Sequence, residues 1–196
     1  MAGWIDSQLR RRGIRDERVL DAMARVPREL FVPEEARRAA YADTALPLPC
    51  GQTISQPFIV AATLQALELA GAERVLEVGT GSGYQAALLR ELAAEVVTIE
   101  RIPELGALAR RNLERSGHGD VEVRVGDGSL GAPDRAPFDA IAVAAETDEV
   151  PPALLAQLAS GGRLVLPLRG YLARVAGGRL ELLLPARFVP LVTGFP

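Results

Sequence analysis

Hydrophobic residues recur along the chain at spacings that change between helical and strand-like periods. Residues 17–26 (ERVLDAMARV) place their apolar side chains on one face of a helix, and Asp16 is suited to cap that helix. A shorter helix is predicted over residues 34–41, where proline and two glutamates mark a helix start. Residues 41–56 have no sustained period and are predicted to be a loop.

From residue 57 onward, short apolar runs alternate with helical patterns. The predicted helices cover residues 57–70, 84–93, 103–117 and 151–162, and the predicted strands cover 74–79, 95–100, 121–128, 138–145 and 163–168. Two strand-like runs around Gly177–Gly178 then predict an antiparallel hairpin. Alternating strands and helices are typical of parallel β-α-β units. The sequence therefore predicts an α/β, Rossmann-like doubly wound fold, mostly parallel, with N-terminal helices and a C-terminal antiparallel hairpin.

Composition and charge narrow the function classes. The net charge is −3, so the chain has no large excess of positive charge with which to bind the phosphates of a nucleic acid. A single cysteine, Cys50, and a single histidine, His118, exclude an internal disulfide and a Cys/His zinc cluster, so we expect no metal. No apolar run approaches membrane-spanning length, and the first residues lack an apolar signal core. We expect a cytoplasmic monomer that binds neither nucleic acid nor membranes.

A glycine-rich turn, EVGTGSG, follows the strand predicted over residues 74–79 and begins at Glu77. Gly79, Gly81 and Gly83 permit a tight turn and the close approach of a ligand to the backbone. Glu100 ends the next strand, where a carboxylate can accept both hydroxyls of a ribose. Spaced glycines alone indicate only a turn, but their position between a strand and a helix indicates a nucleoside ligand.

The glycine spacing bears on which nucleoside binds. A dinucleotide-binding turn has the pattern G-x-G-x-x-G, whereas this turn has the shorter pattern G-x-G-x-G and is preceded by the acidic Glu77. The shorter, acidic turn is better suited to a cationic ligand such as S-adenosylmethionine than to a pyrophosphate. Asp127, in GDG, lies where a carboxylate could accept from an adenine amino group, although alone it would be a turn aspartate. An NAD-dependent reductase is disfavoured by the spacing and by the absence of a hydride-transfer site.

The loop sequence GQTISQP places Ser55 in a setting that suggests a nucleophile. A serine nucleophile needs a base, usually an oriented histidine, and His118 lies in the glycine-flanked stretch SGHGD. From the residues alone, Ser55 is better explained as a cap for the helix that begins at Pro57.

Eight segments are informative in combination: RVPRELFVP, GQTISQPFIVA, VLEVGTGSGYQAALLREL, VTIERI, GDGSLG, APFDAIAV, GGRLVLPL and RFVPLV. Together, over residues 25–192, they resemble the protein-L-isoaspartate O-methyltransferase family, to which GQTISQP and RFVPLV are the most specific. The resemblance implies methyl transfer from S-adenosylmethionine to the free α-carboxylate of L-isoaspartyl residues in damaged proteins or peptides, which starts repair through a succinimide. The acceptor carboxylate is then the nucleophile, and its ordinary pKa of about 3.5–4 removes the need for a base.

The resemblance also implies roles for single residues. Ser55 matches the active-site serine whose hydroxyl donates to the acceptor carboxylate. With the glycine turn included, the expected cofactor-binding residues are Gln52, Thr53, Ile54, Glu77, Gly79, Gly81, Gly83, Glu100, Leu105, Asp127 and Gly128. The expected acceptor-binding residues are Thr53, Ser55, Val189 and Val192.

The same resemblance divides a single methyltransferase domain, residues 1–196, into three parts. Residues 1–56 carry the N-terminal helices and the active-site loop. Residues 57–168 form the cofactor-binding core, and residues 169–196 form the hairpin and a segment that closes over the acceptor.

Two segments depart from the family pattern. AAETDEVPP places Ala144 where the family usually has threonine, and residues 169–186 lack the family's glycine-rich loop. These departures leave open a related methyltransferase that acts on ordinary aspartate of a dedicated peptide partner and gives an aspartimide. A non-catalytic cofactor-binding interaction module is a further alternative, against which Ser55 and Glu100 argue.

Overall fold

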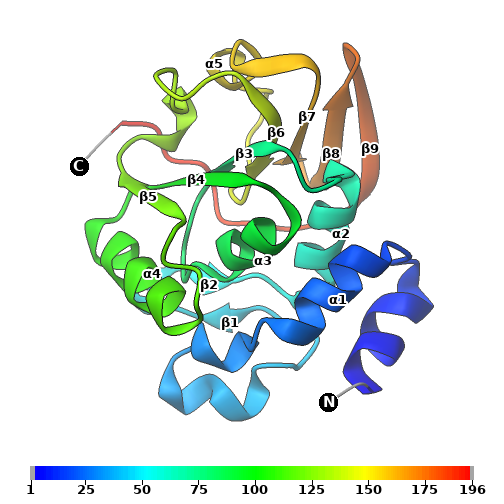
Figure 1. The fold of residues 1–196 in the computed structure, drawn as a ribbon, viewed down its shortest axis with the longest axis vertical. Helices are drawn as coiled ribbons and strands as arrows, with labels where there is room; N and C mark the ends of the chain where they lie inside the picture. The colour runs from blue at the N-terminus through cyan, green and yellow to red at the C-terminus, as the bar shows by residue number, and fades with distance from the viewer. Residues whose placement is uncertain (1–2, 195–196) are drawn as a thin grey trace.

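A central β-sheet organises the protein (Figure 1). In the computed structural model, which describes residues 3–194, this sheet has seven strands in the order β5-β4-β3-β6-β7-β8-β9. Their bounds are β3 (Arg74–Val78), β4 (Glu95–Glu100), β5 (Glu122–Val125), β6 (Phe138–Val143), β7 (Leu158–Leu168), β8 (Tyr171–Ala176) and β9 (Arg179–Pro185). Strands β5 to β7 pair in parallel, and β8 and β9 continue the sheet antiparallel. The predicted α/β class, the doubly wound order and the hairpin are confirmed.

The helices begin and end close to where the sequence pattern places them, with one exception. Their bounds are α1 (Glu17–Arg25), α2 (Pro57–Leu67), α3 (Tyr84–Leu92), α4 (Pro103–Arg115) and α5 (Pro152–Leu155). Asp16 caps α1, because its carboxylate accepts hydrogen bonds from the main-chain nitrogens of Arg18 and Val19. The helix predicted after Pro33 is a 3-10 helix (Glu34–Ala39). None of the helices in the described residues is long and apolar enough to cross a membrane.

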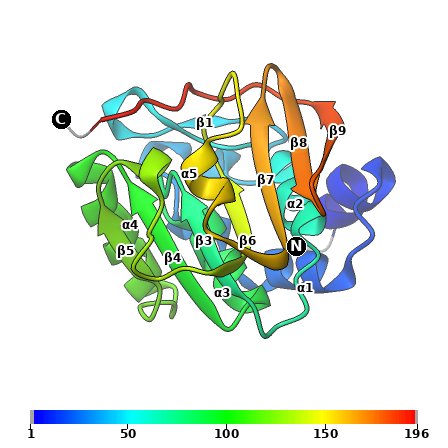
Figure 2. The ribbon, with the colours of Figure 1, turned by 90° about the horizontal axis from the view of Figure 1, so that it is seen from above.

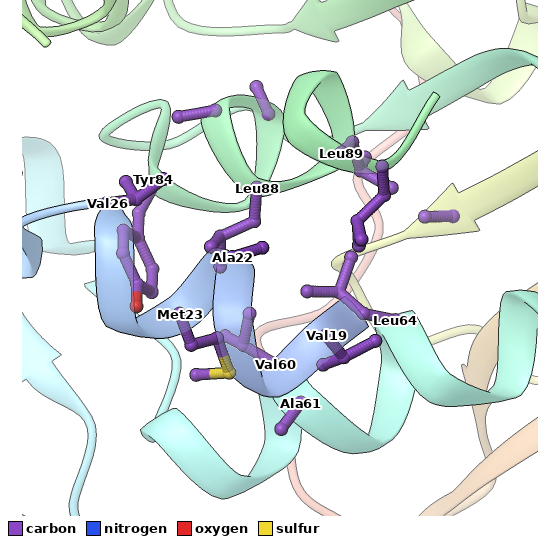
Figure 3. Packing of buried hydrophobic residues seen from close by; sticks show 14 of the residues in the cluster. Val19, Ala22, Met23, Val26, Val60, Ala61, Leu64, Tyr84, Leu88 and Leu89 are labelled. Carbon is purple, nitrogen blue, oxygen red and sulfur yellow. The ribbon is translucent and has the colours of Figure 1, made fainter. Parts of the chain in front are cut away.

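Alternate residues of the strands pack into two different layers, as the period of a strand requires. Val75 and Val165 face a core built largely by α1, α2 and α3, whereas Leu76 and Leu164 face a core on the opposite side of the sheet. Figure 3 shows the first layer, in which α1 lies between α2 and α3. These two layers hold the carboxyl ends of the parallel strands in fixed positions.

The helix predicted over residues 151–162 is wrong in its second half. Helix α5 ends after Leu155, and β7 already begins at Leu158. The side-chain amide of Gln157 donates to the main-chain oxygens of Ala153 at 3.0 Å and Leu130 at 2.8 Å, and its own main-chain oxygen accepts from Phe138 at 2.9 Å. These tertiary contacts end the helix and start the pairing with β6.

The segment predicted as a loop contains a small β-ladder. β1 (Leu46–Pro47) and β2 (Thr53–Ile54) pair antiparallel around Cys50, whose φ is 59°. Figure 2 shows this segment and the segment that follows β9 running along the same edge of the sheet. Both segments therefore reach the end of the sheet at which a ligand is expected.

Candidate active site

The order of the strands reverses at β3, which has β4 on one side and β6 on the other, and ligands of open α/β sheets bind at such a point. Gly79 follows β3, and Ala144 follows β6. The Gly79 main-chain nitrogen donates to the Ile99 oxygen at 2.9 Å, and that of Ala144 donates to the Val78 oxygen at 2.8 Å. A Cβ at Gly79 would lie 3.3 Å from that of Ala144, and φ is +93° there, so both space and conformation favour glycine.

A cavity at this end of the sheet brings together residues from three distant parts of the chain. The expected residues that line it are Gln52, Thr53, Ile54, Ser55, Gly79, Gly81, Glu100, Leu105, Gly128, Val189 and Val192. The lining residues that were not expected to bind the cofactor or the acceptor include Val60, Thr80, Ser82, Tyr84, Gln85, Arg101, Ile102, Ala144, Ala145 and Leu191. Most of these lie within two positions of an expected residue, so adjacency in the sequence was a usable signal for them. Val60 reaches the cavity only through the packing of α2.

Glu100 connects the end of β4 to the glycine turn. Its side chain is 6% exposed, and its two oxygens accept hydrogen bonds from the main-chain nitrogens of Gly81 at 2.8 Å and Ile102 at 3.0 Å. Each carboxylate oxygen can accept a further hydrogen bond. The site therefore offers a fixed pair of acceptors at one side of the cavity.

Glu77 lies behind the turn rather than in the cavity lining, which corrects its expected place beside a cationic ligand. It is fully buried and accepts a hydrogen bond from the Thr98 hydroxyl at 2.6 Å, which is itself 2.6 Å from the Thr80 hydroxyl. Burial raises the pKa of Glu77 to about 8, although the hydrogen bond from Thr98 opposes the rise. A largely protonated carboxyl at neutral pH supports the turn and adds little negative charge.

Gly83 also lies outside the cavity lining and serves the packing of two helices. It precedes α3 with a φ of +88°, and a Cβ there would lie 3.2 Å from the Leu113 side chain and 3.3 Å from the Ala109 oxygen. The close approach of α3 to α4 accounts for this glycine.

Asp127 is the third expected cofactor residue that does not line the cavity. Its Oδ1 accepts from the main-chain nitrogen of Ser129 at 2.9 Å, and its Oδ2 accepts from that of Gly194 at 2.6 Å. Burial alone would raise the pKa of Asp127, but hydrogen bonds from the Ser129 hydroxyl and from these two main-chain nitrogens outweigh it and hold the pKa below its ordinary value. Asp127 caps a 3-10 turn and anchors the segment after β9, while its neighbour Gly128 lines the cavity.

A second cavity adjoins the first. It is lined by Ala45, Thr53, Ser55, Gln56, Ile59, Ala144, Gly170, Tyr171, Pro185, Ala186, Arg187, Phe188 and Val189. Four residues line both cavities: Thr53, Ser55, Ala144 and Val189. A group bound in one cavity would therefore contact a group bound in the other beside these residues.

The structure does not give Ser55 the capping role that its sequence position allows. The residue that precedes α2 is Gln56, which makes no side-chain capping bond, and the Ser55 hydroxyl has no hydrogen-bond partner among the described residues. The main-chain oxygen of Ser55 accepts a hydrogen bond from Arg28 Nη2 at 2.7 Å. The hydroxyl is therefore available to a molecule in either cavity.

The two segments that depart from the family pattern contact each other. The Glu146 carboxylate accepts from the main-chain nitrogen of Gly170 at 2.6 Å, in the short turn between β7 and β8. The main chain of Glu146 also bonds to Val189 and Leu191, at 2.7 Å each. Glu146 thus ties the short turn to the segment after β9, and both form walls of the second cavity.

The lining of the first cavity fits S-adenosylmethionine. Glu100 supplies paired acceptors for ribose hydroxyls, and Ile99, Ile102 and Leu105 supply apolar surface for a base. Tyr84 and Gln85 also line the cavity, and the Gln85 side chain lies beside the buried carboxyl of Glu77.

This fold and cavity define an S-adenosylmethionine-dependent methyltransferase of the Rossmann-like type. The sequence model of one family, Protein-L-isoaspartate(D-aspartate) O-methyltransferase (PCMT), matches residues 5–193. The chain belongs to this family, which confirms the resemblance noted in the sequence.

Individual relatives agree with the family assignment. The protein-L-isoaspartate O-methyltransferase of Koribacter versatilis (strain Ellin345) is 57% identical over 199 residues, which cover 97% of this chain and 90% of the relative. A solved protein-L-isoaspartate O-methyltransferase has a TM-score of 0.81 at 30% identity over 92% of this chain, which spans 62% of that protein. A Plasmodium falciparum structure described as a beta-aspartate methyltransferase (PCMT), in complex with S-adenosyl-L-homocysteine, has a TM-score of 0.83 at 25% identity and covers 97% of both chains.

Proposed function

We propose that this protein transfers the methyl group of S-adenosylmethionine to the free α-carboxylate of L-isoaspartyl residues in damaged proteins or peptides, the first step of their repair. The observation that carries the proposal is the meeting of two cavities at Thr53 and Ser55. The first cavity has the lining of a nucleoside site, and we assign the second to the acceptor peptide. Methyl transfer requires this arrangement, because donor and acceptor must approach within contact distance.

Each part of the site has a role in this reaction. The cofactor supplies an electrophilic methyl group on a sulfonium. Glu100 accepts hydrogen bonds from the ribose and keeps the glycine turn in place, while the Ser55 hydroxyl donates to one oxygen of the acceptor carboxylate and orients the other. The segment 189–192 lines the cofactor cavity and limits the access of water. No protein base is needed, since a carboxylate with an ordinary pKa of about 3.5–4 is ionised at neutral pH.

A methyl-transfer assay with two peptides tests the proposal. The peptides have identical sequences and differ only in an L-isoaspartyl or an L-aspartyl residue at one position. We expect methylation of the isoaspartyl peptide and little of the aspartyl peptide. A preference for the aspartyl peptide would replace this proposal with the aspartimide-forming activity.

We propose that the chain acts as one domain. The hydrophobic core supports this, because one cluster of buried residues includes members from all three parts of the chain, for example Leu20, Val75 and Leu172. The terminal residues 1–2 and 195–196 lie outside the described residues. We also propose a monomer that acts in the cytoplasm, and size-exclusion chromatography with light scattering tests the monomer.

A further inference from the structure

Arg28 is a fully buried arginine next to the candidate active site. It begins a 3-10 helix (Arg28–Leu30), and its side chain is 0% exposed. Nε donates to the main-chain oxygen of Ala40 at 2.8 Å, and Nη2 donates to that of Ser55 at 2.7 Å. Nη1 is buried and has no hydrogen-bond partner among the described residues. Arg28 therefore holds the main chain of Ser55 from inside the protein.

The charge of this guanidinium is not neutralised by a carboxylate. Among the described residues Arg28 takes part in no ion pair, and the adjacent Glu29 accepts a hydrogen bond from Tyr41 instead. Burial lowers the pKa of Arg28, but an arginine side chain stays protonated in proteins. Its Cζ lies 4.8 Å from the centre of the Tyr84 ring, which lines the cofactor cavity. A buried cation without a counter-charge is costly, and this cost calls for a functional reason.

We propose that Arg28 is a positioning residue that acts through Ser55 and also supplies the positive potential that selects a carboxylate at the acceptor site. The inference rests on the proposed function. The Ser55 main chain is fixed by Arg28, so the hydroxyl of the same residue is held at a constant position between the two cavities. An acceptor carboxylate bound there lies within the field of an unpaired cation, which buried surroundings screen only weakly.

The direction of the effect follows from the charge change in the reaction. Methyl transfer converts an anionic carboxylate into a neutral ester, so the field of Arg28 stabilises the bound substrate more than the bound product. Arg28 is therefore expected to lower the KM for the acceptor and to favour release of the ester. The charge itself does not accelerate the chemical step, because the carboxylate loses its charge as the new bond forms.

A binding comparison separates this role from a structural one. The probes are an isoaspartyl peptide and the isoasparaginyl peptide of the same sequence, in which a neutral amide replaces the α-carboxylate. Each is titrated into protein saturated with S-adenosylhomocysteine, so that no turnover occurs. The variants are Arg28→Met, which removes the charge, and Arg28→Lys, which keeps it, measured at about pH 6.5 so that the lysine stays protonated. Arg18→Met is the matched control, because Arg18 also donates to two main-chain oxygens but lines neither cavity.

Wild-type protein and Arg18→Met are expected to prefer the carboxylate peptide to the same degree. In Arg28→Met this preference should fall about tenfold, and Arg28→Lys should keep most of it. An equal loss of affinity for both peptides, or an unchanged preference in Arg28→Met, would overturn the inference, as would a loss in Arg28→Lys as large as in Arg28→Met. If Arg28→Met does not fold, Arg28→Gln, which can still donate to one carbonyl, takes its place with the same expectation. Failure of the wild-type protein to methylate the isoaspartyl peptide would instead refute the proposed function.

Discussion

Replacing Glu100 with glutamine tests whether one carboxylate both shapes the cofactor turn and binds the ribose. Its two oxygens accept from the main-chain nitrogens of Gly81 and Ile102, at 2.8 and 3.0 Å. Glutamine has the same size but only one acceptor oxygen, so its NH₂ group faces one of the two N–H donors. Losing one charge-assisted hydrogen bond costs about 1.5–3 kcal/mol. We expect the free energy of unfolding without cofactor to fall by ~2 kcal/mol, which for this chain length lowers Tm by ~4–8 °C.

The affinity for the cofactor measures the second role. The glutamine leaves one acceptor where the ribose offers two hydroxyls, so we expect the Kd for S-adenosylhomocysteine to rise ~10- to 100-fold in isothermal titration calorimetry. Glu104→Gln is the matched control, because Glu104 is exposed in the first turn of α4 and lines neither cavity. A Glu100→Gln protein that is less stable but binds as tightly as wild type would refute the ribose contact. Unchanged stability would refute the role of Glu100 in the turn.

Three further substitutions test other parts of the site. Ser55→Ala should leave Tm nearly unchanged, since the hydroxyl caps no helix, but should slow single-turnover methyl transfer by ~10- to 1,000-fold; near-normal turnover would show that Ser55 is structural. The pKa of Glu77 is raised from 4.5 to about 8 by folding. Between pH 4.5 and about 8, the folded protein therefore keeps a proton on Glu77 that the unfolded chain has lost, and the free energy of unfolding falls as the pH rises through this range. The Glu77→Gln variant has no titrating group there, so its free energy of unfolding in urea, relative to that of the wild type, should grow with pH by at most ~1.4 kcal/mol per pH unit. If the free energies of unfolding of the two proteins change with pH in parallel, the burial argument is contradicted. Glu146→Ala removes the hydrogen bond that holds the Gly170 turn, so it should raise the KM for peptides ~3- to 10-fold and leave the affinity for the cofactor unchanged. A loss of cofactor affinity would contradict the view that Glu146 supports only the wall of the second cavity.

The features that could be predicted from the sequence are those that neighbouring residues determine. The apolar runs at 74–79 and 95–100 become β3 and β4, because a strand buried on both faces needs only such a run. The turn EVGTGSG adopts positive φ at Gly79, Gly81 and Gly83, as glycine spacing between a strand and a helix indicates.

The features that could not be predicted depend on contacts between distant residues. Glu77 and Asp127 have the residue type of ligand-binding carboxylates, but tertiary hydrogen bonds direct one behind the turn and the other to Gly194. The helix before β7 is cut short by the contacts of Gln157 with residues more than twenty positions away. Arginine is a residue type that is mostly exposed in proteins, and only the packing of the N-terminal segments around Arg28 buries its guanidinium.

The anchored carboxylate of Asp127 also bears on the chemical ageing of the protein. Asp127 precedes Gly128, and an aspartyl–glycyl pair closes most readily to a succinimide, because glycine has no side chain to hinder attack by its main-chain nitrogen on the carboxyl carbon. Here both carboxylate oxygens are held by hydrogen bonds, and the lowered pKa keeps the group ionised and thus a poor electrophile. Gly128 is packed so closely that a Cβ would lie 2.5 Å from Val78, which restricts the rotation that ring closure needs. In its folded state, the protein shields its own cofactor cavity from the lesion that its family repairs.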